Sequence, residues 1–188
     1  VGSEMCIRDS DRGEGIDTLY FVKEITGKGI RAYGYTIGNG KCGIRNTITD
    51  VPGVRVGHYT VKKGKNQTGV TVIIPCDGFV YERKPLAAVY ALNGFGKTQG
   101  TVQIEELGVL ETPIALTNTL NVGKAADGLV TFTEKECRKN GKELVSVNPV
   151  VGETNDSRIN QISERVIEAE DVLFAIEHAE KNFKQGAV

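Results

Sequence analysis

The 188-residue sequence contains no tryptophan, one methionine (Met5) and only two histidines, His58 and His178. Two imidazoles are too few for a metal centre built from several histidines, so that class of site is excluded by count. No apolar run reaches the roughly 18 residues that a membrane-spanning helix requires. The net charge is −1, with acidic and basic residues interspersed, so the sequence carries no sign of the basic surface that binding to nucleic acid or to an acidic membrane needs.

Cysteine is also scarce. The four cysteines form no CxxC pair and no compact disulfide framework (Cys6, Cys42, Cys76 and Cys137). Scattered thiols of this kind are typical of proteins from a reducing compartment, so we expect a cytoplasmic protein. Apolar residues make up 39% and charged residues 25% of the chain, which is the balance of a globular domain.

The sequence begins with VGSEMCIRDS and not with methionine. That string is what a common transposase-type sequencing adapter yields when it is translated in frame, so we expect residues 1–10 to be a technical scar on an assembled metagenomic gene. Residues 11–29 are either upstream sequence read through or genuine protein, and the sequence leaves both open. Residues 30–188 show no repeat or linker and are expected to form one α/β domain.

Strand and helix patterns alternate through that domain. Strands are predicted at 54–61, 68–75, 113–123 and 144–156, and helices at 101–108, 124–141 and 166–183, from apolar spacing and from glycines at their ends. Residues 86–96 are predicted to be either a strand or a helix leading into a glycine-rich loop. Pro52 and Gly53 predict a turn, because proline presets φ and glycine accepts a positive one.

The loop ALNGFGKTQG (91–100) approaches two phosphate-binding patterns and matches neither. A Walker loop ending at GKT would need glycine where Ala91 stands. The glycines at 94, 96 and 100 are spaced one residue too widely for the dinucleotide pattern. A phosphate- or nucleotide-binding domain remains an alternative, because the loop precedes a predicted helix. Tight turns or a close backbone approach explain the glycines better.

The stretch VVGETNDSRIN (150–160) runs from an apolar strand into polar residues. Alternate residues of an extended segment share a face, so Glu153 and Asn155 could point into one cleft. A carboxylate beside an amide donor could hold a cationic group and a developing oxyanion together. The alternative is that these side chains cap or close turns.

Four stretches in this order resemble one family: RNTITDVPGVRVGHYT (45–60), TGVTVIIP (68–75), ALNGFGKTQGTVQIEELGVLETPIALTNTLNVG (91–123) and NPVVGETNDSRIN (148–160). This family is that of the DmpA-type peptidases, which include L-aminopeptidase/D-esterases and β-peptidyl aminopeptidases. The resemblance implies an αββα sandwich similar to that of the N-terminal-nucleophile hydrolases and shared with ornithine acetyltransferases. Acyl transfer on the same fold is a further alternative, but ITDVPGVRVGH and GETND favour the peptidases.

The resemblance also implies a mechanism. The family's precursor cleaves itself ahead of a serine, which becomes a new chain start and attacks amides or esters, releasing N-terminal residues. The α-amino group beside that hydroxyl has a pKa of about 8 and can serve as the local base. The family requires no metal or organic cofactor.

By this resemblance, Glu153 matches the carboxylate that receives the substrate ammonium. Asn155 stands where several members carry an oxyanion-stabilising tyrosine. Asn93, Gly94, Gly96 and Asn118 are expected near the active site. No serine here matches the nucleophile, so we expect an inactive fragment holding most of the leading subunit. It should expose apolar strand surface that the missing subunit covers, and the complete protein is expected to form homo-oligomers without binding nucleic acid or membrane.

Overall fold

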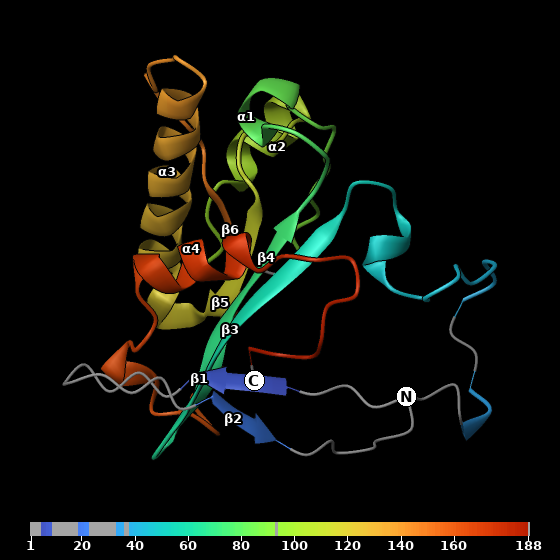
Figure 1. The fold of residues 1–188 in the computed structure, drawn as a ribbon, viewed down its shortest axis with the longest axis vertical. Helices are drawn as coiled ribbons and strands as arrows, with labels where there is room; N and C mark the ends of the chain where they lie inside the picture. Colours follow the sequence, from blue (N-terminus) through green and yellow to red (C-terminus); the bar gives the residue numbers. More distant parts are fainter. Residues whose placement is uncertain (1–4, 9–18, 23–32, 36–37, 93, 188) are drawn as a thin grey trace.

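The computed structural model of the chain describes residues 5–8, 19–22, 33–35, 38–92 and 94–187 (Figure 1). A mixed sheet lies at its centre, with the order β3-β4-β5-β6. Its strands are β3 (Arg55–Lys63), β4 (Asn66–Ile74), β5 (Ile114–Asn118) and β6 (Val150–Thr154). Neighbours are antiparallel except β5 and β6, which run parallel. Two further strands, β1 (Met5–Arg8) and β2 (Leu19–Val22), pair antiparallel in a separate sheet.

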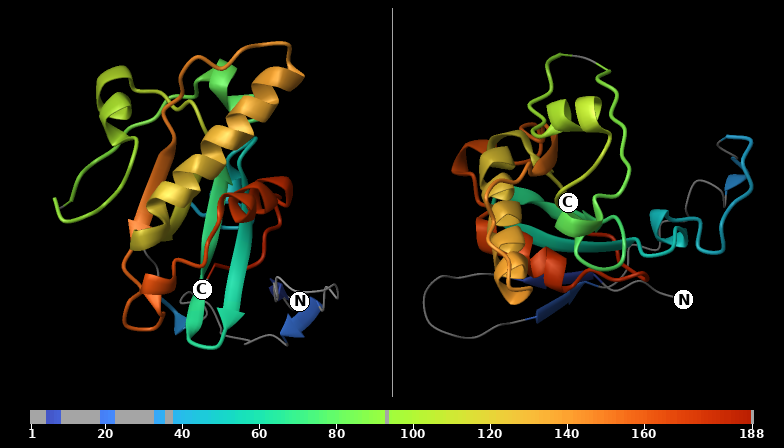
Figure 2. Two further views of the ribbon diagram at one scale, coloured as in Figure 1. Left: turned by 90° about the vertical axis from the view of Figure 1, so that its left-hand side faces the viewer. Right: turned by 90° about the horizontal axis from the view of Figure 1, so that it is seen from above.

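Two helices cover one face of the four-stranded sheet (Figures 1 and 2). Helix α4 (Ala169–Glu177) packs on β3 and β4, and α3 (Val122–Lys139) packs on β5 and β6. Alternate strand residues supply the core on this side, and the most completely buried are Val70, Val72, Ala115 and Val151. Each large apolar side chain buried there contributes about 1.5–3 kcal/mol. Among the described residues no helix combines the length and hydrophobicity needed to cross a bilayer.

A glycine lets β3 approach α4 unusually closely. A Cβ atom on Gly57 would lie 1.8 Å from the carbonyl oxygen of Ala175. Only a residue without a side chain fits between this strand and this helix. Helix α4 therefore packs directly against the backbone of β3.

The opposite face of the sheet is only partly covered. Leu116 keeps 41% of its surface exposed although β5 is a central strand. Over β3, by contrast, the Phe183 ring lies 5.8 Å from the His58 ring, and the Ala187 N–H donates to Thr60 Oγ1 at 2.7 Å. The helix and sheet layers correspond to half of the predicted αββα sandwich, and the described residues contain no second large sheet facing Leu116.

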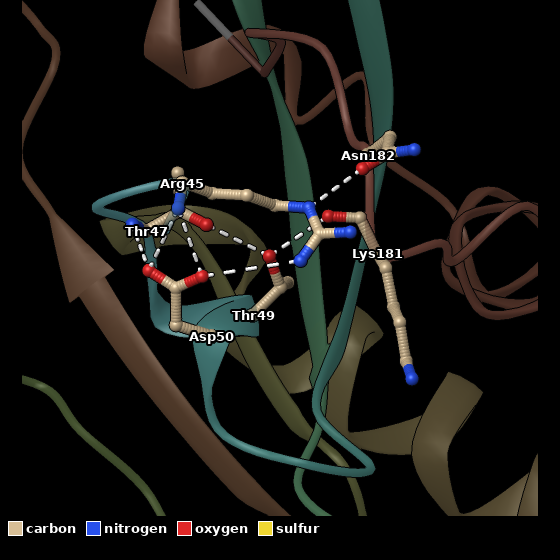
Figure 3. Close-up of polar contacts among 6 residues, drawn as sticks. All are labelled: Arg45, Thr47, Thr49, Asp50, Lys181 and Asn182. Atoms are coloured by element: carbon tan, nitrogen blue, oxygen red, sulfur yellow. Dashed lines mark hydrogen bonds and ion pairs between the residues drawn. The ribbon is translucent and has the colours of Figure 1, made fainter. Parts of the chain in front are cut away.

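The stretch RNTITDVPGV is held against the segment that follows α4 (Figure 3). Arg45 Nε donates to Asn182 Oδ1 at 2.8 Å, and Thr49 Oγ1 donates to the Lys181 carbonyl at 2.8 Å. The Arg45 backbone N–H donates to Asp50 Oδ1 at 3.0 Å. This hydrogen bond is the main reason that the pKa of Asp50 is lowered. One of the stretches that carry the resemblance thus has a structural role, joining two distant parts of the chain.

Most predicted elements are confirmed. The first two strands and the helix 124–141 form as expected, and α2 (Thr101–Leu107) ends at Gly108, whose φ is 66°. The turn glycine Gly53 has φ 85°. The predicted strand 113–123 divides into β5 and the 3-10 helix η3 (Thr119–Asn121). Short helical segments occur at α1 (Val80–Arg83), η2 (Ile48–Asp50) and η4 (Ile162–Glu164).

Three predictions were wrong in extent or type. Residues 86–92 and 94–96 form neither a strand nor a helix. They run as an irregular excursion from the sheet (Figure 2), with a bridge between Leu86 and Val109. Strand β6 begins only at Val150. Helix α4 is shorter than 166–183, because Glu168 caps its start with Asp171 and because Glu180 pairs with β3 through Val56.

Candidate functional site

The candidate site lies where the parallel strands β5 and β6 end side by side. In their register Thr117 pairs with Glu153, and Asn118 pairs with Thr154. Because parallel strands bring their carboxyl ends to the same edge, the residues that follow β5 meet the polar tip of β6. The Glu153 side chain at this edge is half-buried.

Two neutral donors hold the Glu153 carboxylate. Its Oε1 accepts a hydrogen bond from the Lys97 backbone N–H at 3.2 Å, and its Oε2 accepts a short one from the Thr119 hydroxyl. None of the ion pairs found among the described residues involves Glu153. The carboxylate is therefore oriented but lacks a cationic partner in this part of the chain, which suits it to receive an ammonium group.

The glycine-rich loop contacts this carboxylate through its backbone. A Cβ atom on Gly96 would lie 3.7 Å from Glu153 Oε1, whereas one on Gly94 would meet nothing within 4 Å. The Lys97 ammonium turns back on its own loop, where it donates to the Phe95 carbonyl and lies 3.3 Å from the centroid of the Phe95 ring. The prediction for Asn93 falls outside the described residues.

This arrangement disfavours the phosphate-binding alternative. A phosphate cradle presents backbone N–H groups to an anion. Here the N–H of Lys97 already serves a carboxylate, and a second anion beside it would be repelled.

Asn118 is buried and shapes the site indirectly. Its Oδ1 accepts from the Asn121 N–H at 3.2 Å, which caps η3. Its Nδ2 donates to Thr68 Oγ1 at 3.1 Å, and the Thr68 hydroxyl donates to Asp156 Oδ2 at 2.7 Å. Asn118 thereby fixes the start of η3, the element that carries Thr119.

Asn155 is exposed and closes a local turn. Its Oδ1 accepts from the Ser157 N–H at 3.1 Å, which is the turn role that the sequence left as the alternative. An oxyanion would need the amide NH2 of this side chain, which makes no hydrogen bond within the described part of the chain. The oxyanion role of Asn155 stays a prediction.

Neither Thr119 nor the Lys97 backbone was predicted from the sequence as part of the site. Thr119 is the last residue of the stretch TPIALTNT (112–119), and no local sequence pattern indicates that a threonine will donate a hydrogen bond to a distant carboxylate. Two surface depressions of about 380 and 360 Å³ occur elsewhere, lined by residues near Cys42 and near Lys124, and Glu153 lines neither. In the described ranges no group of three or more His, Cys, Asp or Glu side chains could hold a metal ion.

Residues 46–188 match Peptidase family S58. The β-peptidyl aminopeptidase BapA of Sphingosinicella microcystinivorans is 35% identical in an alignment of 150 residues that covers 74% of this chain. The chain spans 36% of the length of that relative. The resemblance to the DmpA-type peptidases is thereby confirmed.

Two solved structures are similar in fold as well as in sequence. A β-aminopeptidase from a Burkholderia species superposes with a TM-score of 0.71 and 42% identity, over 84% of this chain and 44% of that one. An L-aminopeptidase D-Ala-esterase/amidase from Ochrobactrum anthropi superposes with a TM-score of 0.69 and 28% identity, over 81% of this chain and 44% of that one. The latter is described as a prototype serine aminopeptidase and a variant of the Ntn-hydrolase fold. The predicted fold class is confirmed.

Proposed function

The chain belongs to peptidase family S58, and on this premise we propose that the full-length protein is a self-processing serine aminopeptidase. It releases N-terminal residues from small peptides, amides or esters. The nucleophilic serine lies in a part of the protein outside these 188 residues, and its own α-amino group, with a pKa of about 8, acts as the base. The subunit that carries this serine completes the sandwich over Leu116.

The proposal is supported chiefly by the environment of the Glu153 carboxylate. A half-buried carboxylate, oriented by Lys97 N–H and the Thr119 hydroxyl and without an ion-pair partner in the described part of the chain, can receive the substrate ammonium. Recognition of that charge favours substrates with a free N-terminal amine over those without one. Asn155 is proposed as an oxyanion donor, with Gly94, Gly96, Asn118 and Asn93 around the site.

The remaining parts of the proposal concern the whole protein. We propose that the protein is cytoplasmic, which the scattered cysteines support. We also propose that the processed subunits form a homo-oligomer. The names of the similar proteins support peptide, amide and ester substrates, with β-amino acid residues among those to be tested.

The test is expression of the complete gene. Self-cleavage is followed by mass spectrometry, and activity by release of p-nitroaniline from α-, β- and D-aminoacyl p-nitroanilides. A complete protein that neither cleaves itself nor hydrolyses any of these amides overturns the proposal.

A matched pair of variants tests the role of Glu153. Glu153→Gln should lower kcat/KM on free-amine substrates about 10- to 100-fold, because a hydrogen bond to a charged group contributes about 1.5–3 kcal/mol. Glu143→Gln removes the same charge from an exposed position after α3 and should leave activity unchanged. Equal activity in the two variants contradicts the ammonium-binding role.

A further inference from the structure

The Glu153 carboxylate is held from two sides by groups on different elements. The donor to Oε1 is a main-chain N–H of the loop before α2, and the donor to Oε2 is the hydroxyl of Thr119 on η3. The last torsion of a glutamate side chain is broad when nothing restrains it. Because each oxygen has its own donor, the plane of the carboxylate is restrained, and each oxygen keeps a lone pair for a ligand.

Thr119 is itself held in place. It is the first residue of η3, and the buried Asn118 that precedes it caps this turn and is anchored to Thr68. Threonine is β-branched, so its χ1 angle is stiff. The hydroxyl therefore meets Glu153 without a large loss of side-chain freedom.

We propose that Thr119 is a positioning residue that orients the Glu153 carboxylate for the substrate ammonium, so that selection for free-amine substrates depends on its hydroxyl. This inference rests on the proposed function. The ammonium contact exists in the bound substrate and in the transition state alike. Loss of the hydroxyl should therefore raise KM and leave kcat nearly unchanged.

The experiment uses the complete, processed enzyme and two substrates. One is an aminoacyl p-nitroanilide with a free amine, and the other is p-nitrophenyl acetate, an ester that has no amine. Thr119→Val keeps the shape of the side chain and removes the hydroxyl; it should raise KM for the anilide about three- to tenfold, the range expected for one hydrogen bond. Thr119→Ser restores a hydroxyl and should return KM to within about twofold of the wild type. Hydrolysis of the acetate should not change in either variant.

Each contrary result has a distinct meaning. An unchanged KM in Thr119→Val together with a raised KM in Glu153→Gln overturns the positioning role and leaves the proposed function standing. Equal losses on both substrates in Thr119→Val also overturn it, because they indicate general structural damage. An unchanged KM in Glu153→Gln overturns the ammonium-binding role of Glu153, and the inference with it. The proposed function itself is overturned if the complete wild-type protein hydrolyses none of the amides.

Thermal unfolding and gel analysis of processing establish that each variant is folded and matured. Thr119→Ala serves as the second hydroxyl-free variant if Thr119→Val does not mature, with the same rise in KM expected.

Discussion

At the residue scale, two glycines of the loop before α2 differ in what a methyl group would meet. Neither has a positive φ, so the backbone at both positions accepts alanine. Gly96→Ala should lower kcat/KM on free-amine substrates roughly tenfold, because its methyl group would lie 3.7 Å from Glu153 Oε1 and take up space beside that oxygen, and one methyl group in a pocket has effects of this size. Gly94→Ala should have a smaller effect, because a Cβ atom there would meet nothing within 4 Å. Kinetics of the complete enzyme provide the measurement, and equal losses in both variants would contradict the geometry.

His58 links stability to pH. Its ring centroid lies 5.8 Å from that of Phe183, its Nδ1 shares a hydrogen bond with Thr71 Oγ1 at 2.8 Å, and its Nε2 is buried. Burial lowers the pKa of His58 below its usual 6.5, although a backbone hydrogen bond at Lys184 acts in the opposite direction.

The sign of the pH effect follows from this lowered pKa. The unfolded chain binds a proton at His58 more readily than the folded chain does, so the free energy of unfolding should fall as pH drops below about 6.5 towards the folded pKa. Urea unfolding between pH 5 and 8 measures it. His58→Gln should reduce this pH dependence, and an unchanged slope in that variant would show that other groups cause it.

At the scale of a single element, helix α3 contains two glycines in contrasting surroundings. Gly123→Ala should stabilise the chain by about 0.5–1 kcal/mol, because the position is open and alanine is the better helix former. Gly128→Ala should destabilise it by about 1–3 kcal/mol, because the new Cβ would lie 2.7 Å from Val172 Cβ on α4. Urea unfolding of the two variants gives the comparison, and changes of the same sign would show that α3 and α4 are not in close contact at Gly128.

The elements also show how far local pattern reaches. The apolar run of 68–75 and the glycine at 108 predicted β4 and the end of α2 correctly, because strand burial and helix termination depend on neighbouring residues. Residues 86–96 were misread because short apolar runs occur in irregular segments too. The early end of α4 was missed because it depends on the bridge between Glu180 and Val56, across 124 positions of the chain.

At the scale of the whole molecule, the sheet face around Leu116 is expected to be an interface. Leu116→Asp should prevent the complete protein from assembling with its second subunit and from processing itself, because it places a charge on apolar surface that assembly buries. Val145→Asp changes an exposed residue of the segment before β6 and should have no such effect. Size-exclusion chromatography and gel analysis of processing compare the two. Normal assembly of Leu116→Asp would show that this face stays open to solvent.

The sequence by itself determined the α/β class, most strands and helices, and the placement of an acidic residue at a strand end, since these follow from periodicity and turn chemistry within short windows. Only the tertiary structure decided which groups donate hydrogen bonds to Glu153 and which segment the stretch at 45–50 contacts. Those contacts join residues 34, 56 and 137 positions apart. The physical reason is that the register of β5 against β6 and the packing of the helices on the sheet bring these residues into contact. No local preference of a threonine, a loop amide or an arginine specifies a partner so far away in the sequence.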